Sequence, residues 1–124
     1  MSIADGCILV AAILPYLWVI VAKAGKNYNN AAPRPQLEQS TGYRKRAYWA
    51  QLNAFEAFPP FAAAVIVAQL QHVAPLTLDK IALGFIGVRI LHGIFYLLDW
   101  AALRSLAWLS GFLLIISLFV LAAN

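Results

Sequence analysis

Four long runs of apolar residues dominate this chain and decide what it can fold into. At the 1.5 Å rise per residue of an α-helix, about 20 residues cross the roughly 30 Å hydrocarbon core of a bilayer. Of the 124 residues, 63% are hydrophobic and 11% are charged, which is more apolar than the surface of a small soluble domain allows. The sequence therefore predicts an all-α integral membrane protein, with residues 1–124 forming a single four-span transmembrane domain arranged as a four-helix bundle. The predicted spans are residues 3–22, 50–70, 78–98 and 106–123.

The basic residues are unevenly distributed between these spans. Six of the nine Lys and Arg residues lie in the loop of residues 23–46, namely Lys23, Lys26, Arg34, Arg44, Lys45 and Arg46. Because basic loops face the cytoplasm, we expect this loop on the cytoplasmic side and both termini on the other side. Basic residues between apolar runs indicate orientation and contact with membrane lipids, so we expect no nucleic-acid partner. Residues 27–42, rich in Asn, Pro and Gln, fit either an ordered turn or a mobile flap.

Ionisable side chains also occur inside the spans. Glu56 lies in the second span and Arg89 in the third. Each charge costs roughly 2.5–3.5 kcal/mol at the centre of a lipid-facing helix. We therefore expect both side chains to face protein or water, and to face each other. The single cysteine, Cys7, excludes an internal disulfide and a Cys-x-x-Cys metal site.

Further polar residues recur with helical spacing near these two charges. The second span carries polar residues at i, i+7 and i+10, and the third at i, i+3 and i+7, so each set lies on roughly one helix face. All lie toward the predicted cytoplasmic ends of the spans, which predicts a hydrated or ligand-filled cleft there. The residues are Arg46, Asn53 and Glu56 on the second span, Arg89, His92 and Tyr96 on the third, and Arg104 and Ser105 at the start of the fourth.

Other interpretations of these residues remain open on chemistry alone. The polar set is also typical of a structural ion pair that joins helices. Glu56, Arg89 and His92 also fit a small transporter or channel that relays protons. Haem ligation by His72 and His92 is disfavoured, because these residues fall at different predicted depths. The Pro59-Pro60 pair frees backbone carbonyls, so it indicates either a kink repaired by a neighbouring helix or extra room beside Glu56.

Three short strings of this sequence resemble motifs of a known family. In chain order they are Arg46 followed by Asn53-Ala-Phe-Glu56-Ala-Phe-Pro-Pro, then Arg89-Ile-Leu-His92-Gly-Ile-Phe-Tyr96, and finally Leu103-Arg104-Ser105. Their order, with four spans and a basic first loop, resembles the MAPEG family (membrane-associated proteins in eicosanoid and glutathione metabolism). The short loops resemble a bacterial-type member, which implies a bacterial inner membrane.

The resemblance implies a membrane-bound glutathione transferase, with or without peroxidase activity. It implies a homotrimer that binds glutathione, its co-substrate, between neighbouring subunits near the cytoplasmic face. The bound thiolate would attack a lipophilic small-molecule substrate. A catalytically silent family member is the alternative. Carried over by position, the glutathione-binding residues are Arg46, Asn53, Glu56, Arg89, His92 and Tyr96, and the catalytic residues are Arg104 and Ser105.

The chain departs from the resembled members at two cationic positions. Where those members carry an arginine near the end of the first span, this chain offers Lys23 and Lys26. An arginine that often precedes the motif asparagine is replaced by Leu52. A lysine is less suited than an arginine to bidentate binding of a carboxylate.

Overall fold

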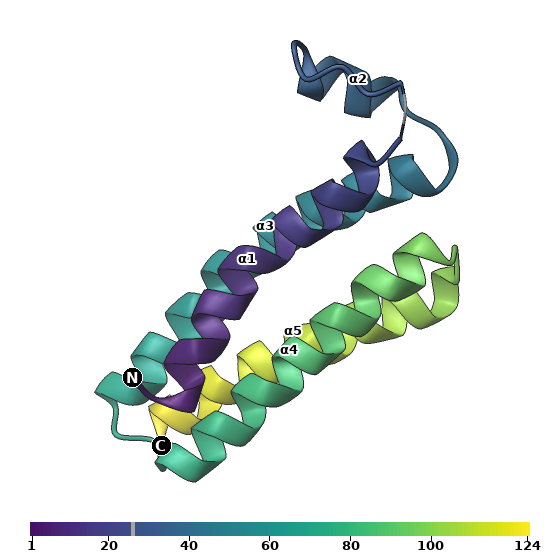
Figure 1. Cartoon of the computed structure of the whole chain (residues 1–124). Coiled ribbons are helices and arrows are strands. Elements are labelled where there is room, and N and C mark those ends of the chain that lie inside the picture. The colour runs from purple at the N-terminus through teal and green to yellow at the C-terminus, as the bar shows by residue number, and fades with distance from the viewer. Residues whose placement is uncertain (26) are drawn as a thin grey trace.

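Four long helices and one short helix make up the part of the chain that the structure describes, residues 1–25 and 27–124. This computed structural model has no strand within those ranges. The long helices are apolar enough to cross a membrane, so the chain is a multi-pass membrane protein and the predicted all-α, four-span fold is confirmed. In chain order the helices are α1 (Ile3–Lys23), α2 (Pro33–Gln39), α3 (Gly42–Leu70), α4 (Pro75–Leu97) and α5 (Ala101–Ala123) (Figure 1).

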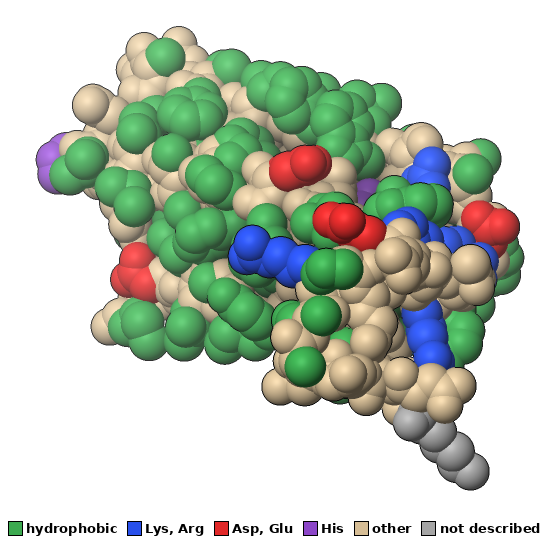
Figure 2. Space-filling view, turned by 90° about the horizontal axis from the view of Figure 1, so that it is seen from above, with side chains coloured by type: hydrophobic (Ala, Val, Ile, Leu, Met, Phe, Trp, Pro, Cys, Tyr) green, Lys and Arg blue, Asp and Glu red, His purple; other side chains and the backbone are tan. Residues whose placement is uncertain are grey.

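The long helices pack as two pairs. Helix α1 packs mainly on α3, and α4 packs mainly on α5, with further contacts between the pairs. Both termini lie at one end of the bundle and α2 lies at the other (Figure 1). Figure 2 shows hydrophobic side chains over much of the surface, with Lys and Arg side chains gathered in the middle and on the right of the view. The apolar surface fits a lipid environment, and the α2 end carries most of the positive charge.

Three helices begin before the apolar runs that mark them in the sequence. Helix α3 begins at Gly42 rather than near residue 50, so Arg44, Lys45 and Arg46 lie on its first turns and not in a loop. Lys and Arg are good helix formers whose long stems can reach the membrane surface, so the helix continues beyond its apolar part. Likewise α4 begins with its favoured first-turn proline at Pro75 and α5 begins at Ala101.

The segment between α1 and α3 contains an ordered helix. Helix α2 starts with Pro33 at its first position, where the missing N–H has no helical partner to lose. The Leu37 side chain of α2 is 4% exposed and packs in a small cluster with Ala47 of α3 and with residues of α1. Lys26, one of the six basic residues of the predicted loop, lies outside the described residues.

The half of the bundle that holds the termini is tightly packed. Phe61 and Phe85 stack with ring centroids 4.0 Å apart between α3 and α4. Small buried residues let α1 and α3 approach closely, which is how helices gain contact area in a membrane. These small residues are Ala4, Ala11, Ala64 and Ala68.

Side-chain hydrogen bonds join the helices at this same end. Asp79 Oδ1 accepts a hydrogen bond from the Ala4 backbone N–H at 2.9 Å, which ties the start of α1 to α4. Gln69 Nε2 donates to Asp5 Oδ1 at 2.8 Å, which ties α1 to α3. Ser2 and Asp5 form a reciprocal capping box that satisfies the first N–H groups of α1.

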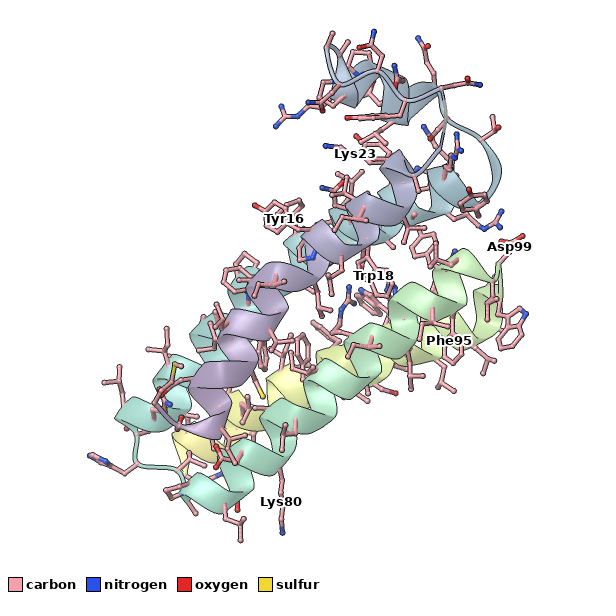
Figure 3. The ribbon with its side chains drawn as sticks, in the orientation of Figure 1. Tyr16, Trp18, Lys23, Lys80, Phe95 and Asp99 are labelled. Carbon is pink, nitrogen blue, oxygen red and sulfur yellow. The ribbon has the colours of Figure 1, made fainter. Side chains whose placement is uncertain are left out.

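Nearer the α2 end, α1 reaches α4 through one large side chain. Trp18 points from α1 toward α4 (Figure 3) and lies against Gly93. A Cβ atom at residue 93 would lie 2.0 Å from Trp18 Cζ2, so only glycine leaves room for this ring. The contact fixes the distance between α1 and α4 beside the polar residues of α4.

We expect Gly93→Ala to destabilise the protein, because the indole of Trp18 must move out of its packed position. Overpacking of this kind typically costs about 1–3 kcal/mol. Thermal unfolding in detergent measures the loss. Gly87→Ala is the matched control, because a Cβ there meets nothing within 4 Å. Equal melting temperatures for the two variants would contradict the packing role of Gly93.

Candidate functional site

A hydrogen-bonded chain of three polar side chains joins α3 to α4. Arg89 Nη2 donates to Asn53 Oδ1 at 2.6 Å, and Asn53 Nδ2 donates to Glu56 Oε2 at 3.5 Å. Asn53 and Glu56 lie one helical turn apart on α3, which places them on one face. Glu56 and Arg89 are thus connected through the amide of Asn53, where the sequence indicated that they face each other.

The two charged members of this chain differ in their surroundings. Arg89 is only 4% exposed, whereas Glu56 lies on the surface of the subunit. A buried guanidinium needs hydrogen-bond acceptors, because its desolvation is expensive. Asn53 supplies one acceptor, and Arg89 also lines a pocket between α3, α4 and α5.

A second group of polar and aromatic side chains joins α4 to α5. The guanidinium of Arg104 lies 4.6 Å from the ring centroid of Tyr96, which is cation–π geometry. His92 meets Tyr96 edge-on, with ring centroids 5.5 Å apart. His92 is 3% exposed, and Arg104 is half-buried. Ser105 follows Arg104 on the first turns of α5 and is exposed.

Three pockets surround Asn53 and bring both groups together. The first, of about 240 Å³, runs between α3, α4 and α5 and includes Glu56 and Arg89. The second, of about 160 Å³, is lined by His92, Tyr96, Arg104 and Ser105, together with Asn53 and Trp108. The third, of about 370 Å³, opens more widely beside Glu56 and Tyr96. Seven of the eight residues singled out by sequence therefore line pockets that share Asn53: Asn53, Glu56, Arg89, His92, Tyr96, Arg104 and Ser105.

Arg46 makes a different contact. Its Nε and Nη2 atoms donate to the Leu97 carbonyl at 3.2 and 3.0 Å. Leu97 ends α4, where backbone carbonyls lack helical partners. Arg46 thus caps α4 from α3 and does not line the three pockets around Asn53.

Among the pocket residues that the sequence did not indicate, three on α5 share one helix face. Trp108, Gly111 and Ile115 line the 240 Å³ pocket. They follow Arg104 at i+4, i+7 and i+11, which is one helix face. Extending the spacing argument from Arg104 would have found them, but without a charged side chain nothing separated them from the lipid-facing residues of α5.

The two histidines lie in different surroundings. His72 lies exposed in the turn between α3 and α4 with a positive φ of 58°, whereas His92 is buried beside Tyr96. Among the residues described, no group of three or more His, Cys, Asp or Glu side chains is placed to hold a metal ion.

The fold and the site together define the class of this protein. This is a four-span α-helical membrane protein with an arginine-containing pocket between α3, α4 and α5. The sequence model of the MAPEG family matches residues 6–124, and the chain belongs to the MAPEG family. A search of curated proteins and a search of solved structures each gave no match.

We expect Asn53→Leu to destabilise the protein, because it leaves the buried Arg89 guanidinium without its acceptor. Breaking such a contact typically costs about 2–4 kcal/mol. The double variant Asn53→Leu/Arg89→Met should recover most of this loss, because the buried charge is then removed with its partner. Chemical denaturation in mixed micelles compares the three proteins. A double variant no more stable than Asn53→Leu would contradict this account.

Proposed function

We propose that this protein is a membrane-bound glutathione transferase, in which the thiolate of bound glutathione attacks a lipophilic electrophile. Membership of the MAPEG family, which includes glutathione transferases, supports the proposal. The observation that carries it is the grouping of Arg89, Glu56 and Arg104 around Asn53, in two pockets that share Asn53. The same thiolate could reduce a lipophilic hydroperoxide, which would be the peroxidase variant of this function.

The polar groups around Asn53 complement the groups of glutathione. Glutathione carries two carboxylates, one ammonium and one thiol. A guanidinium binds a carboxylate with two parallel hydrogen bonds, which suits Arg89. The exposed carboxylate of Glu56 suits the ammonium, and His92 and Tyr96 line the space between Asn53 and Arg104. We therefore propose Asn53, Glu56, Arg89, His92 and Tyr96 as the binding set, and Arg46 as a residue that supports α4.

We propose that Arg104 activates the thiol. A free thiol has a pKa of about 8.5 and is mostly protonated at neutral pH, and a neighbouring guanidinium lowers that pKa. The face of Tyr96 holds the Arg104 guanidinium at the rim of the pocket. The hydroxyl of Ser105 lines the same pocket and can donate a hydrogen bond to the sulfur.

The position of Glu56 supports a homotrimer. A carboxylate on the surface of a membrane helix is costly unless protein or water covers it, and a neighbouring subunit would do so. Lys23 supports the same arrangement. It lines a separate pocket with Tyr16 and Gln51, and Lys23 and Tyr16 point away from α4 (Figure 3). Lys23 would thus reach glutathione bound to a neighbouring subunit rather than its own.

The charge distribution supports an orientation in the membrane. Arg34, Arg44, Lys45 and Arg46 lie on α2 and the first turns of α3. By the positive-inside rule we place this end, with the site, in the cytoplasm and both termini on the other side. With a bacterial-type member, the membrane would be the bacterial inner membrane.

The packing of the bundle argues against a transporter or channel. A relay from Glu56, Arg89 and His92 would need polar groups through the rest of the membrane. Toward the termini the described residues instead form a dry core, in which Phe61 and Val65 are 0% exposed.

We expect Arg104→Ala to shift the pH dependence of conjugation upward. Without the guanidinium the pKa of the bound thiol returns toward about 8.5, and each unit of increase lowers the thiolate fraction at neutral pH about tenfold. Rates with glutathione and 1-chloro-2,4-dinitrobenzene should fall at least about tenfold at neutral pH and approach those of the parent above that pKa. Lys80→Ala is the control, because Lys80 is exposed at the far end of the bundle (Figure 3).

Two results would contradict the mechanism. Matching pH–rate profiles for Arg104→Ala and the parent would remove Arg104 from thiol activation. Absence of binding heat in isothermal titration with millimolar glutathione would remove glutathione itself.

We expect native mass spectrometry in detergent to show three 13.6 kDa chains per particle. Chains carrying Lys23→Ala and chains carrying Arg104→Ala should each lose activity, since each lacks one half of a site shared between subunits. Co-expression should restore about a quarter of the sites, because random mixing pairs the intact halves at that frequency in a symmetric ring. Monomeric particles, or no recovery on mixing, would contradict the shared site.

A further inference from the structure

The turn between α4 and α5 is short and fully hydrogen-bonded. Asp99, in its centre, has a positive φ of 60°, a conformation that glycine usually supplies after the end of a helix (Figure 3). The Asp99 N–H donates to the Tyr96 carbonyl at 3.2 Å, and the Trp100 N–H donates to the Phe95 carbonyl at 2.9 Å. These two bonds form a Schellman motif, and the Phe95 and Trp100 rings, with centroids 5.9 Å apart, add its usual hydrophobic contact. A turn built in this way fixes the direction in which α5 leaves α4.

Arg46 of α3 binds the carbonyl that follows those used by the turn. The turn's own N–H groups bind the carbonyls of Phe95 and Tyr96. The next carbonyl, that of Leu97, accepts hydrogen bonds from Arg46 Nε at 3.2 Å and from Arg46 Nη2 at 3.0 Å. Arg46 thus completes the end of α4 from a different helix. Both residues belong to one chain, so the contact does not depend on how subunits assemble.

The same turn also determines where Arg104 lies. The Arg104 N–H donates to the Trp100 carbonyl at 2.9 Å, which is the first backbone hydrogen bond of α5. The Arg104 guanidinium lies over the ring of Tyr96, and the Tyr96 carbonyl is one of the acceptors in the turn. The backbone and the side chain of Arg104 are therefore both held by the end of α4.

We propose that Arg46 is a positioning residue for Arg104. It holds the Leu97 carbonyl on α3, and so fixes where the turn between α4 and α5 presents the Arg104 guanidinium. The inference rests on the proposed transferase function, and adds to it a residue that acts on the glutathione thiol only through Arg104. Arg46 is thereby distinguished from the residues proposed to bind glutathione directly.

The lining of the pocket of Arg104 supports an indirect role. Its titratable side chains besides Arg104 are His92 and Tyr96 of α4, and α3 contributes Asn53, which is uncharged. Arg46 does not line this pocket. Its removal should therefore change the ionisation of the thiol by moving Arg104, and leave the affinity for glutathione as it was.

A pH titration of bound glutathione tests this role. The ultraviolet absorbance of the thiolate, measured as a difference from glutathione alone, gives the pH at which half of the bound thiol is ionised. We expect Arg46→Met to raise this pH by about 0.5–1, which lowers the thiolate fraction at neutral pH about three- to tenfold, with glutathione affinity unchanged. Arg46→Lys should give a smaller rise, because lysine keeps one donor group where arginine has two. Arg44→Met is the matched control, because Arg44 lies on the same turns of α3 but against Gly25.

Two further measurements separate positioning from a direct effect of the Arg46 charge. If Arg46 acts through Arg104, the double variant Arg46→Met/Arg104→Ala should titrate like Arg104→Ala alone. Hydrogen exchange gives a structural readout that needs no glutathione. The backbone N–H groups of Asp99, Trp100 and Arg104 should exchange faster in Arg46→Met, while those of α1 keep the rates of the parent.

The outcomes distinguish this inference from the proposed function. An unchanged titration in Arg46→Met, with or without faster exchange in the turn, would overturn the positioning role and leave the transferase function standing. A double variant whose thiol ionises at a higher pH than in Arg104→Ala would do the same. If Arg46→Met does not fold, Arg46→Lys and its double variant with Arg104→Ala decide. No thiolate signal and no binding heat for glutathione in the parent would overturn the transferase function and the positioning role with it.

Discussion

The burial of one guanidinium at membrane depth is the constraint on which the rest of this site depends. Arg89 is 4% exposed on α4, so its charge must be met by acceptors on a neighbouring helix. Asn53 meets it from α3, and Glu56 extends the contact to the subunit surface. The pair of helices is thereby held in one register, and the space left beside their polar side chains becomes the pockets around Asn53.

The two ends of the bundle are built differently. Toward the termini, alanines and stacked phenylalanines pack without solvent, and Asp79 and Gln69 bind the first turn of α1 to α4 and α3. Toward α2, helices meet through long side chains that leave space between them, such as Trp18 on Gly93 and Arg46 on the end of α4. The end that holds the termini therefore positions the four helices, and the polar pockets lie outside its packed core.

Much of the site could be predicted because helical spacing fixes which residues share a face. That rule was enough to select Asn53 with Glu56 and Arg89 with Tyr96, and the apolar runs were enough to predict four spans. It could not show that Asn53 would lie between the two charges, since that depends on helix separation. It could not show that Arg46 would reach the last carbonyls of α4, because the contact depends on where α4 ends. Gly111 could not be predicted as a pocket residue, because it carries no side chain that a spacing argument could select.

The orientation of the Asn53 side-chain amide is fixed by its two hydrogen-bond partners. Its oxygen faces the Arg89 guanidinium and its nitrogen faces the Glu56 carboxylate. Rotating the amide by 180° would place a donor against the donor of Arg89 and an acceptor against the acceptor of Glu56. A carboxylate at Arg89 would meet a guanidinium whose Nη2 is already bound to Asn53, so it would use the other N–H donors. Asn53 would thus keep the Arg89 guanidinium oriented while its other donors remain for a second acceptor.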